Sequence, residues 1–253
     1  MWRHLKRCLV GTVSAFFALT VLSVLALRFI PPVTSAFIVH AYVTAWTQGN
    51  WGWRAEHVWT PYADISPQAK IAVITSEDQK FPSHHGFDLE QIDQAIEERE
   101  SGRRVRGAST ISQQVAKNLF LWPGQSFIRK GIEAYLTVLI EALWPKQRIL
   151  EMYLNIAEFG PGVYGVGAAA PRYFHHSPAQ ITPSEGALLA AVLPSPKHLK
   201  ADRPSAYVQR RVDTILGLEA TLGGTTYLKK FEQPELQKTV TAKPGSSPHR
   251  SSR

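Results

Sequence analysis

The stretch EDQKFPSHHGFD at residues 77–88 follows an apolar run and closes it with two neighbouring acids, Glu77 and Asp78. A proline, two histidines and a glycine come next, and Asp88 ends the stretch. A helix that only fills a hydrophobic core has little reason to end on two carboxylates, because buried charges are costly unless they are paired. The pattern therefore indicates a helix that carries a carboxylate to the edge of a cleft.

The formal net charge of +8 on this chain of 253 residues lies at its two ends. Residues 1–28 and 223–253 contribute +4 each, whereas residues 29–222 carry 18 basic and 18 acidic side chains. A nucleic-acid-binding domain would carry the excess on its folded part, so we exclude that class. Within the body, residues 77–100 sum to −6 and residues 103–148 to +6. Either these segments pair with each other as solvated helix faces, or an acidic catalytic wall faces a site for an anionic group.

Residues 8–27 contain no charged side chain. Twenty helical residues span about 30 Å, which is the thickness of the hydrocarbon core of a bilayer. Arg3, Lys6 and Arg7 precede this segment and place the N-terminus in the cytoplasm by the positive-inside rule. A cleaved signal peptide would have a shorter apolar region and a small-x-small site, unlike the LRFIPP sequence at 27–32. We therefore expect an uncleaved membrane anchor.

The remainder of the chain predicts an almost entirely helical body. Helix starts are marked by Ser66-Pro67, by capping-box patterns at Asp88 and Thr182, and by Ser109. The first expected helix starts at 66, is apolar to Ile74 and ends on the acid pair 77–78. The others run from 88 onward and over 109–120, 127–143, 146–157, 182–193 and 205–220. A short strand near 51–60 is the exception. Four tryptophans, at 46, 51, 53 and 59, either pack under a small subdomain or touch the membrane surface.

The stretch GASTISQQVAKN at 107–118 fits a helix whose start can face an anion. Ser109 and Thr110 lie at its N-terminus, where free N–H groups and the helix dipole favour negative charge. One polar face of this helix carries Gln113, Gln114 and Lys117. A capped surface helix explains the same pattern, so both interpretations stay open.

The stretch RKGIE at 129–133 sets Arg129 and Glu133 four residues apart, so they can pair on one helix face. The following residues of this helix are strongly apolar. A carboxylate on its polar edge near Glu77 would instead create a site with two carboxylates.

The stretch KQRILEMYLNIAEFG at 146–160 offers a third group of polar residues. Asn155 can cap the helix or hydrogen-bond the site. Glu151 and Glu158 are expected to be exposed helix acids, and Tyr153 is expected to pack.

Taken in order, these blocks resemble the motifs of the family 51 glycosyltransferases, the peptidoglycan polymerases. The family patterns are ED-x-x-F-x-x-H-x-G-F-D, G-A-S-T-I-x-Q-Q-x-A-K-N, R-K-x-x-E and I-L-E-x-Y-L-N, and they are met at 77–88, 107–118, 129–133 and 149–155. The S-x-x-K and K-[ST]-G marks of a penicillin-binding transpeptidase are missing from the sequence. The chain therefore resembles the monofunctional members.

The resemblance implies a mainly α fold, with a lysozyme-like helical glycosyltransferase domain preceded by one transmembrane helix. It divides the chain into a cytoplasmic tip and anchor at 1–30, a membrane-proximal connector at 31–65 and the glycosyltransferase domain at 66–225. The polar residues of 226–253 predict a disordered tail. The catalytic domain would lie on the periplasmic side of the inner membrane.

The resemblance also implies polymerisation of lipid II into glycan strands. Glu77 matches the catalytic base, which deprotonates the 4-hydroxyl of the acceptor N-acetylglucosamine. That oxygen attacks the anomeric carbon of the donor N-acetylmuramic acid with inversion, and undecaprenyl diphosphate leaves. Glu133 matches a second carboxylate that orients Glu77, assists the leaving group or helps to hold a cation. Substrate contacts are implied for Asp78, Lys80, Phe81, His84, Ser109, Thr110, Gln113, Gln114, Lys117, Asn118, Arg129, Lys130 and Asn155.

No cofactor is expected, although a Mg²⁺ or Mn²⁺ ion that assists the diphosphate stays open. The single Cys8 excludes an intramolecular disulfide and a cysteine-based zinc site, and the nine histidines show no tight ligand spacing. The expected partners are lipid II, the growing lipid-linked strand and the membrane, with division or elongation proteins left open. Two alternatives remain: a lytic enzyme of the same fold that cleaves glycan strands, and a non-catalytic scaffold of the wall machinery.

Overall fold

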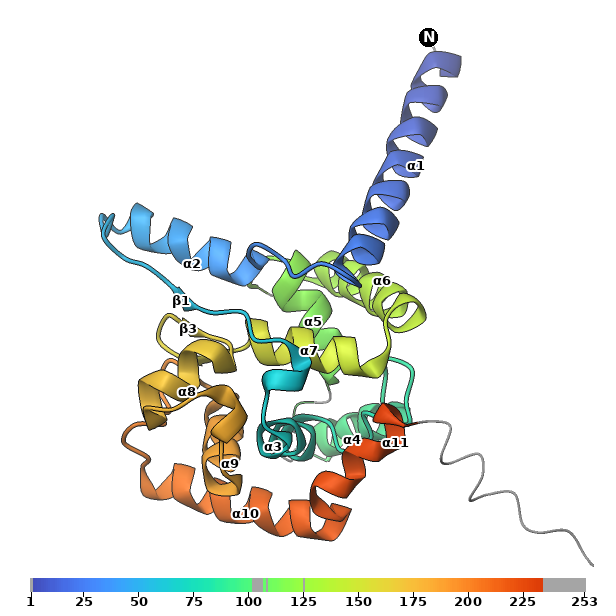
Figure 1. Cartoon of the computed structure of the whole chain (residues 1–253). Coiled ribbons are helices and arrows are strands. Elements are labelled where there is room, and N and C mark those ends of the chain that lie inside the picture. Colours follow the sequence, from blue (N-terminus) through green and yellow to red (C-terminus); the bar gives the residue numbers. More distant parts are fainter. Residues whose placement is uncertain (1, 102–106, 108, 125, 234–253) are drawn as a thin grey trace, which may run out of the picture.

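The computed structural model describes residues 2–101, 107, 109–124 and 126–233, and it is mainly helical (Figure 1). Its α-helices are α1 (Trp2–Leu27), α2 (Ala36–Thr47), α3 (Pro67–Glu77), α4 (Leu89–Glu100), α5 (Ile111–Phe120), α6 (Phe127–Leu143), α7 (Lys146–Ile156), α8 (Val166–Phe174), α9 (Pro183–Val192), α10 (Ala206–Leu222) and α11 (Lys229–Glu232). The short 3-10 helices are η1 (Tyr62–Asp64), η2 (Pro178–Gln180) and η3 (Gly224–Leu228). The strands are β1 (Glu56–His57), β2 (Glu158–Gly160) and β3 (Val163–Tyr164). The predicted mainly α class is confirmed.

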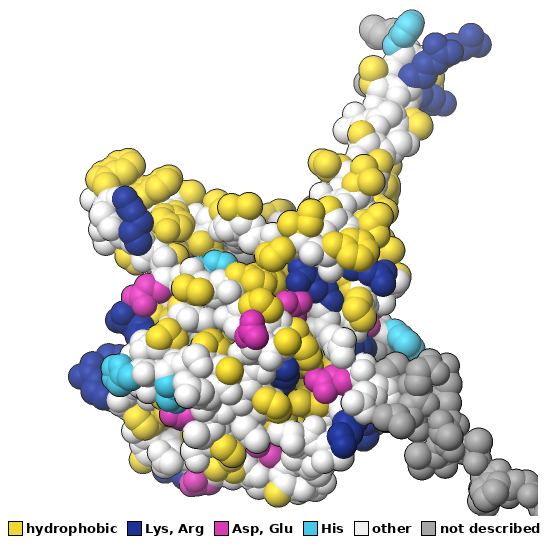
Figure 2. All heavy atoms as spheres, viewed as in Figure 1, with side chains coloured by type: hydrophobic (Ala, Val, Ile, Leu, Met, Phe, Trp, Pro, Cys, Tyr) yellow, Lys and Arg dark blue, Asp and Glu magenta, His cyan; other side chains and the backbone are white. Residues whose placement is uncertain are grey.

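Helix α1 leaves the body as a single rod (Figure 1), and apolar side chains cover much of it below a basic tip (Figure 2). Among the described residues it is the helix long and apolar enough to cross a membrane. Its C-terminal end is fastened to the body. Trp144 Nε1 donates to the carbonyl of Val24 at 2.7 Å, and the guanidinium of Arg148 donates to the carbonyl of Leu27 at 2.8 and 3.0 Å. Helix α1 therefore joins the domain through these hydrogen bonds as well as through the chain.

Helix α2 extends sideways near the base of α1, and its far end carries a cluster of apolar side chains (Figure 2). Trp46 and Trp51 stack there with ring centroids 6.2 Å apart, and they are 42% and 68% exposed. Trp53 is only partly exposed and packs edge-on against Tyr42 at 5.0 Å. The packing interpretation is confirmed for Trp53, and membrane contact by the exposed Trp46 and Trp51 stays a prediction.

Helix α3 is the central helix of the body, and it packs against α9 and α10. Its start is the predicted one: the Ser66 side chain accepts from the N–H of Gln68, and Pro67 is the first helical residue. The helix ends at Glu77, on the acid pair that closes the apolar run, and Ile71 to Ile74 within it are fully buried in the core. The length of this buried helix therefore decides where Glu77 lies.

The structure differs from the sequence-based expectation in three places. The N-cap of α5 is Thr110, whereas Ser109 precedes it as an exposed residue. A small sheet in the order β1-β3-β2 includes the predicted strand near 51–60, but β2 and β3 are too short to leave a period-two pattern. Residues 226–232, expected in the tail, belong to η3 and α11, because Tyr227 and Leu228 are buried. Residues 234–253 lie outside the described residues.

Gly167 in α8 marks a close approach between two backbones. A Cβ at this position would lie 2.1 Å from the carbonyl oxygen of Val58 and 2.5 Å from Oγ1 of Thr60. We expect Gly167→Ala to destabilise the domain by about 2–3 kcal/mol through overpacking, which lowers the melting temperature by roughly 5–10 °C. Circular dichroism of the detergent-solubilised protein measures the shift.

Gly217→Ala in α10 is the matched control, since a Cβ there meets nothing within 4 Å. It should leave the melting temperature unchanged or raise it slightly, because alanine is the better helix former. Equal melting temperatures for the two variants would contradict the close approach.

Candidate active site

Glu77 is the last residue of α3, and its partly exposed carboxylate is held by neighbours on two helices. Gln114 on α5 donates from Nε2 to Oε2 of Glu77 at 2.9 Å, and Ser76 donates from Oγ to Oε1 at 3.4 Å. Tyr153 on α7 donates its hydroxyl to Oε1 of Gln114 at 3.2 Å. This bond fixes the Gln114 amide so that its NH₂ group faces Glu77.

Burial raises the pKa of Glu77 above the ordinary value of 4.5. The hydrogen bond from Gln114, the positive charge of Arg211, the hydrogen bond from Ser76 and the charge of Lys117 oppose this effect in turn. The net direction is upward, and a carboxyl with a raised pKa is a stronger base when ionised. Glu77 is therefore tuned toward accepting a proton nearer to neutral pH.

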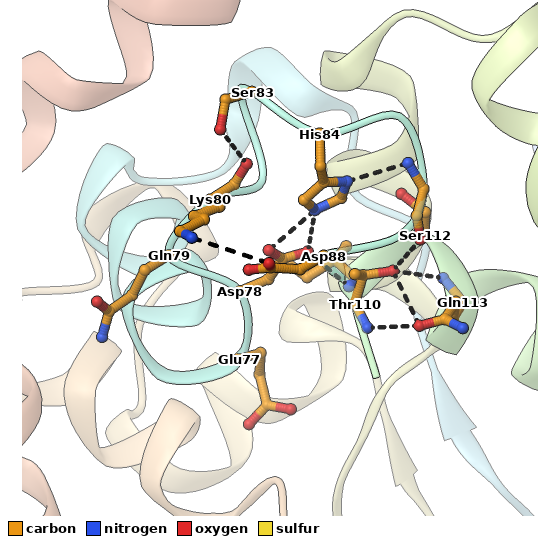
Figure 3. A network of polar contacts seen from close by, with 12 residues as sticks. Glu77, Asp78, Gln79, Lys80, Ser83, His84, Asp88, Thr110, Ser112 and Gln113 are labelled. Atoms are coloured by element: carbon orange, nitrogen blue, oxygen red, sulfur yellow. Dashed lines mark hydrogen bonds and ion pairs between the residues drawn. The ribbon is translucent and has the colours of Figure 1, made fainter. Parts of the chain in front are cut away.

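Asp78 has a different task from its neighbour, although the two are adjacent in sequence. It is buried, and its Oδ2 accepts from Nε2 of His84 at 2.8 Å and from the backbone N–H of Ile111 at 2.9 Å. The N–H of Gly86 donates to Nδ1 of His84 at 3.0 Å, so the proton of the imidazole is on Nε2. Figure 3 shows the Glu77 carboxylate pointing away from this network. Asp78 and His84 thus join the turn after α3 to the start of α5.

A cleft of about 380 Å³ is lined in part by Gln114, the residue that donates to Glu77. Residues from α2, α5, α7, β2, β3 and the 193–198 segment line it, among them Phe37, Gln114, Lys117, Asn118, Tyr153, Glu158 and Lys197. Oδ1 of Asn118 is buried and lacks a hydrogen-bond partner among the described residues. The cleft therefore presents an ammonium, an amide and a free acceptor at one wall, as a polar ligand such as a sugar requires.

Glu133 lies buried on α6 between two cations. Its Oε2 accepts from Arg129 at 3.0 Å, and its Oε1 accepts from Lys130. Burial lowers the pKa of Lys117. The charges of Arg129 and Lys130 lower this pKa further, whereas Glu133 and Glu77 oppose the shift. Lys117 is thus in electrostatic range of both carboxylates. The group of three cations and Glu133 has an excess of positive charge.

A family model described as Transglycosylase matches residues 46–219 of this chain. Three curated relatives share the name "Biosynthetic peptidoglycan transglycosylase". The protein of Xanthomonas campestris pv. campestris (strain B100) is 54% identical over 214 residues, covering 85% of this chain and 87% of its own. That of Xanthomonas oryzae pv. oryzae (strain KACC10331 / KXO85) is 52% identical over 226 residues, covering 88% and 92%. That of Xylella fastidiosa (strain M23) is 48% identical over 228 residues, covering 90% and 93%.

The chain belongs to the transglycosylase family. The resemblance drawn from the motifs is confirmed, and so is the predicted enzyme class, a glycosyltransferase of peptidoglycan synthesis.

Several motif residues of this transglycosylase stabilise the fold through hydrogen bonds to the backbone. Thr110 and Gln113 form the capping box of α5, and Thr110 also donates to the carbonyl of Gly86 at 2.7 Å. Asn155 has no exposed surface. Its side chain accepts from the N–H of Thr60 and donates to the carbonyl of Thr60, so it holds the end of the 56–60 segment. Backbone groups occupy these side chains in this structure, and the substrate contacts of Thr110, Gln113 and Asn155 stay a prediction.

Two residues of the first motif also lie away from the cleft. Phe81 is fully buried and packs against Phe231 and His84. Lys80 pairs with Glu90 on α4 and lies 3.9 Å from Asp88. The sequence could not separate them from Glu77, because all of them follow the same helix end.

Arg211 is a site residue of this transglycosylase that the sequence did not indicate. Its Nε donates to the carbonyl of Ala191 at 3.1 Å, its Nη2 lies 3.5 Å from Oγ of Ser76, and its charge acts on Glu77. Arg211 lies on α10, 134 residues after Glu77 in the sequence. Nothing in the local sequence of α10 marks it, because its role depends on the packing of α10 against α3.

Proposed function

We propose that this transglycosylase polymerises lipid II on the outer face of the membrane, with Glu77 as the general base. The observation that carries the proposal is the juxtaposition of the partly buried Glu77 carboxylate, whose pKa is raised, with a group of cations of which Lys117 lines the cleft. Lys117 is in electrostatic range of Glu77 and of the Arg129–Lys130–Glu133 group. A base for a hydroxyl and positive charge for a leaving diphosphate are the two groups that glycosyl transfer from a lipid diphosphate needs.

In the proposed reaction, Glu77 takes the proton from the 4-hydroxyl of the acceptor N-acetylglucosamine. The freed electron pair of that oxygen forms the bond to the anomeric carbon of the donor N-acetylmuramic acid. The bond from this carbon to the phosphate oxygen breaks, and its electron pair leaves with undecaprenyl diphosphate. Attack from the opposite face inverts the α linkage to β.

The leaving group is already anionic, so it needs positive charge more than a proton. Lys117 is the cation in this group that also lines the cleft. Arg129 and Lys130 supply further charge, and Glu133 holds both of them in place. We therefore assign Glu133 the task of orienting cations, and Gln114 and Asn118 the task of binding sugar or amide groups.

The described residues supply no complete protein ligand set for a divalent cation at this site. Within the described residues no group of three or more potential ligands could hold a metal, and Glu133 is already paired with Arg129 and Lys130. No step of the proposed reaction uses a metal.

The proposed location is the inner membrane, with the N-terminus in the cytoplasm and the catalytic domain in the periplasm. The basic residues before α1 support this orientation, and the exposed Trp46 and Trp51 suit the membrane interface. Protease added to intact spheroplasts should digest the domain. Digestion only after lysis would contradict the orientation.

Two incubations of the full-length protein test the function itself. One uses lipid II in detergent or vesicles, and the other uses purified sacculi. The proposal expects glycan polymer from lipid II and no soluble muropeptides from sacculi. Muropeptides without polymer would favour the lytic alternative, and neither product would favour the scaffold.

A further inference from the structure

We propose that the C-terminal segment Gly224–Glu232, made of η3 and α11, positions the catalytic carboxylate by holding the turn that follows Glu77. The inference rests on the proposed function of Glu77. The segment lies beyond residues 46–219, which the family model matches.

The turn after Glu77 has local backbone hydrogen bonds at its start and, through the carbonyl of Lys80, at its end. The helix hydrogen bonds of α3 end at Asp78, whose N–H donates to the carbonyl of Ile74 at 2.9 Å. The next local bond joins the N–H of Phe81 to the carbonyl of Asp78 at 3.0 Å. The path of residues 78–81 depends on these bonds and on what packs against them, and that path decides how firmly the last residue of α3 is fixed.

One side of the turn is held by α5 and the other by the C-terminal segment. On the first side, Asp78 accepts from Ile111 and His84. On the second side, the hydroxyl of Tyr227 donates to the carbonyl of Gln79 at 2.6 Å. Tyr227 is 8% exposed, so water cannot easily replace this bond.

Phe231 adds an apolar contact to the same turn. Its ring meets the buried ring of Phe81 edge to face, with centroids 5.7 Å apart and an interplanar angle of 84°. Phe81 is also covered by Lys146, whose ammonium lies 4.6 Å from the ring centroid. Tyr227 and Phe231 thus hold residues two and four positions after Glu77.

The segment is itself fixed to the body, as a positioning element must be. The hydroxyl of Tyr62 donates to Oε1 of Glu232, and Nε2 of Gln147 donates to the carbonyl of Glu232 at 3.5 Å. The ammonium of Lys70 lies 3.7 Å from the centroid of the Tyr62 ring. Contacts therefore connect Tyr62 to α11, and α11 to the turn after Glu77.

Tyr227→Phe removes one hydroxyl and keeps the ring. We expect kcat on lipid II to fall about tenfold, because a small displacement of a catalytic group costs that much or more, while KM stays within about twofold. Loss of one hydrogen bond should shift the melting temperature by only about 5 °C or less. Phe231→Leu should lower kcat in the same direction.

The acid limb of the pH profile of kcat/KM separates the two roles, because a purely structural role of Tyr227 would leave this limb at the same pH. The charged or titratable groups facing Glu77 are Lys117 from α5, Tyr153 from α7 and Arg211 from α10. Release of the turn admits water to Glu77, so the pKa of its carboxyl falls toward the ordinary value and the limb moves to lower pH.

Tyr207→Phe is the control, because Tyr207 is a 51% exposed tyrosine at the start of α10. It should match the wild type. If the wild type is active but Tyr227→Phe has an unchanged kcat and an unchanged acid limb, only the positioning role is overturned. A loss of kcat in Tyr227→Phe that equals the unfolded fraction of the variant overturns it in the same way. A wild-type chain that forms no polymer overturns the proposed function and this inference with it.

Discussion

Glu77→Gln should lower the rate of lipid II polymerisation by about 10²-fold or more, the usual scale for loss of a general base. The amide has the shape of the carboxylate and can still accept from Gln114, but it cannot take a proton. The melting temperature should stay close to that of the wild type. Rates from a gel-based polymer assay, together with a thermal melt of each variant, measure both quantities.

The pH dependence of the wild type gives a second view of the same residue. Glu77 acts as a base only when ionised, and burial raises the pKa of its carboxyl above 4.5. Activity should therefore fall as the pH is lowered through that raised pKa, at a higher pH than for an ordinary glutamate.

Glu90→Gln is the control for Glu77→Gln, since Glu90 is an exposed acid that pairs with Lys80. Polymerisation retained in Glu77→Gln would remove Glu77 from the role of base.

Lys117→Ala should lower kcat/KM for the lipid-linked donor by about 10²-fold, as loss of a charge-stabilising donor does in other enzymes. Lys117 lines the cleft and lies in electrostatic range of both carboxylates, yet among the described residues no ion pair within 4.0 Å involves it. Its removal should therefore change stability little. Steady-state kinetics with a donor analogue, beside thermal melts, separate the two effects.

Arg129→Ala should behave differently, because Arg129 is buried in a pair with Glu133. Breaking such a pair leaves a buried charge with one partner fewer and typically costs about 3–5 kcal/mol. Arg210→Ala is the control for loss of one positive charge, since Arg210 is exposed on α10. If Lys117→Ala keeps full donor use, the leaving group is stabilised elsewhere.

Local signals in the sequence gave the helices that have clear ends. Ser66-Pro67 and Thr182-Pro-Ser-Glu predicted the starts of α3 and α9, and the apolar pattern of 127–143 predicted α6 to the residue. Tyr227, Leu228 and Phe231 have helical spacing, yet the polar residues around them hid this short pattern. Tertiary packing was needed to recognise η3 and α11 as part of the domain.

The roles of single side chains were harder to predict than the elements that carry them. Glu77 and Asp78 are neighbours, and successive residues of a helix point about 100° apart, so only one can face the cleft. The helix pattern alone does not show which one does, and only the family motif pointed to Glu77. Arg211 and Tyr227 act on the site from more than 130 residues away, and only the packing of α10 and η3 on α3 brings them there.

The hydrogen bonds from Trp144 and Arg148 to the end of α1 have a mechanical consequence. They leave no loose tether between the membrane-spanning rod and the domain. The position of Glu77 relative to the end of α1 is then fixed within the molecule. For the proposed lipid-linked substrate, the same bonds would set one depth at which it meets the carboxylate.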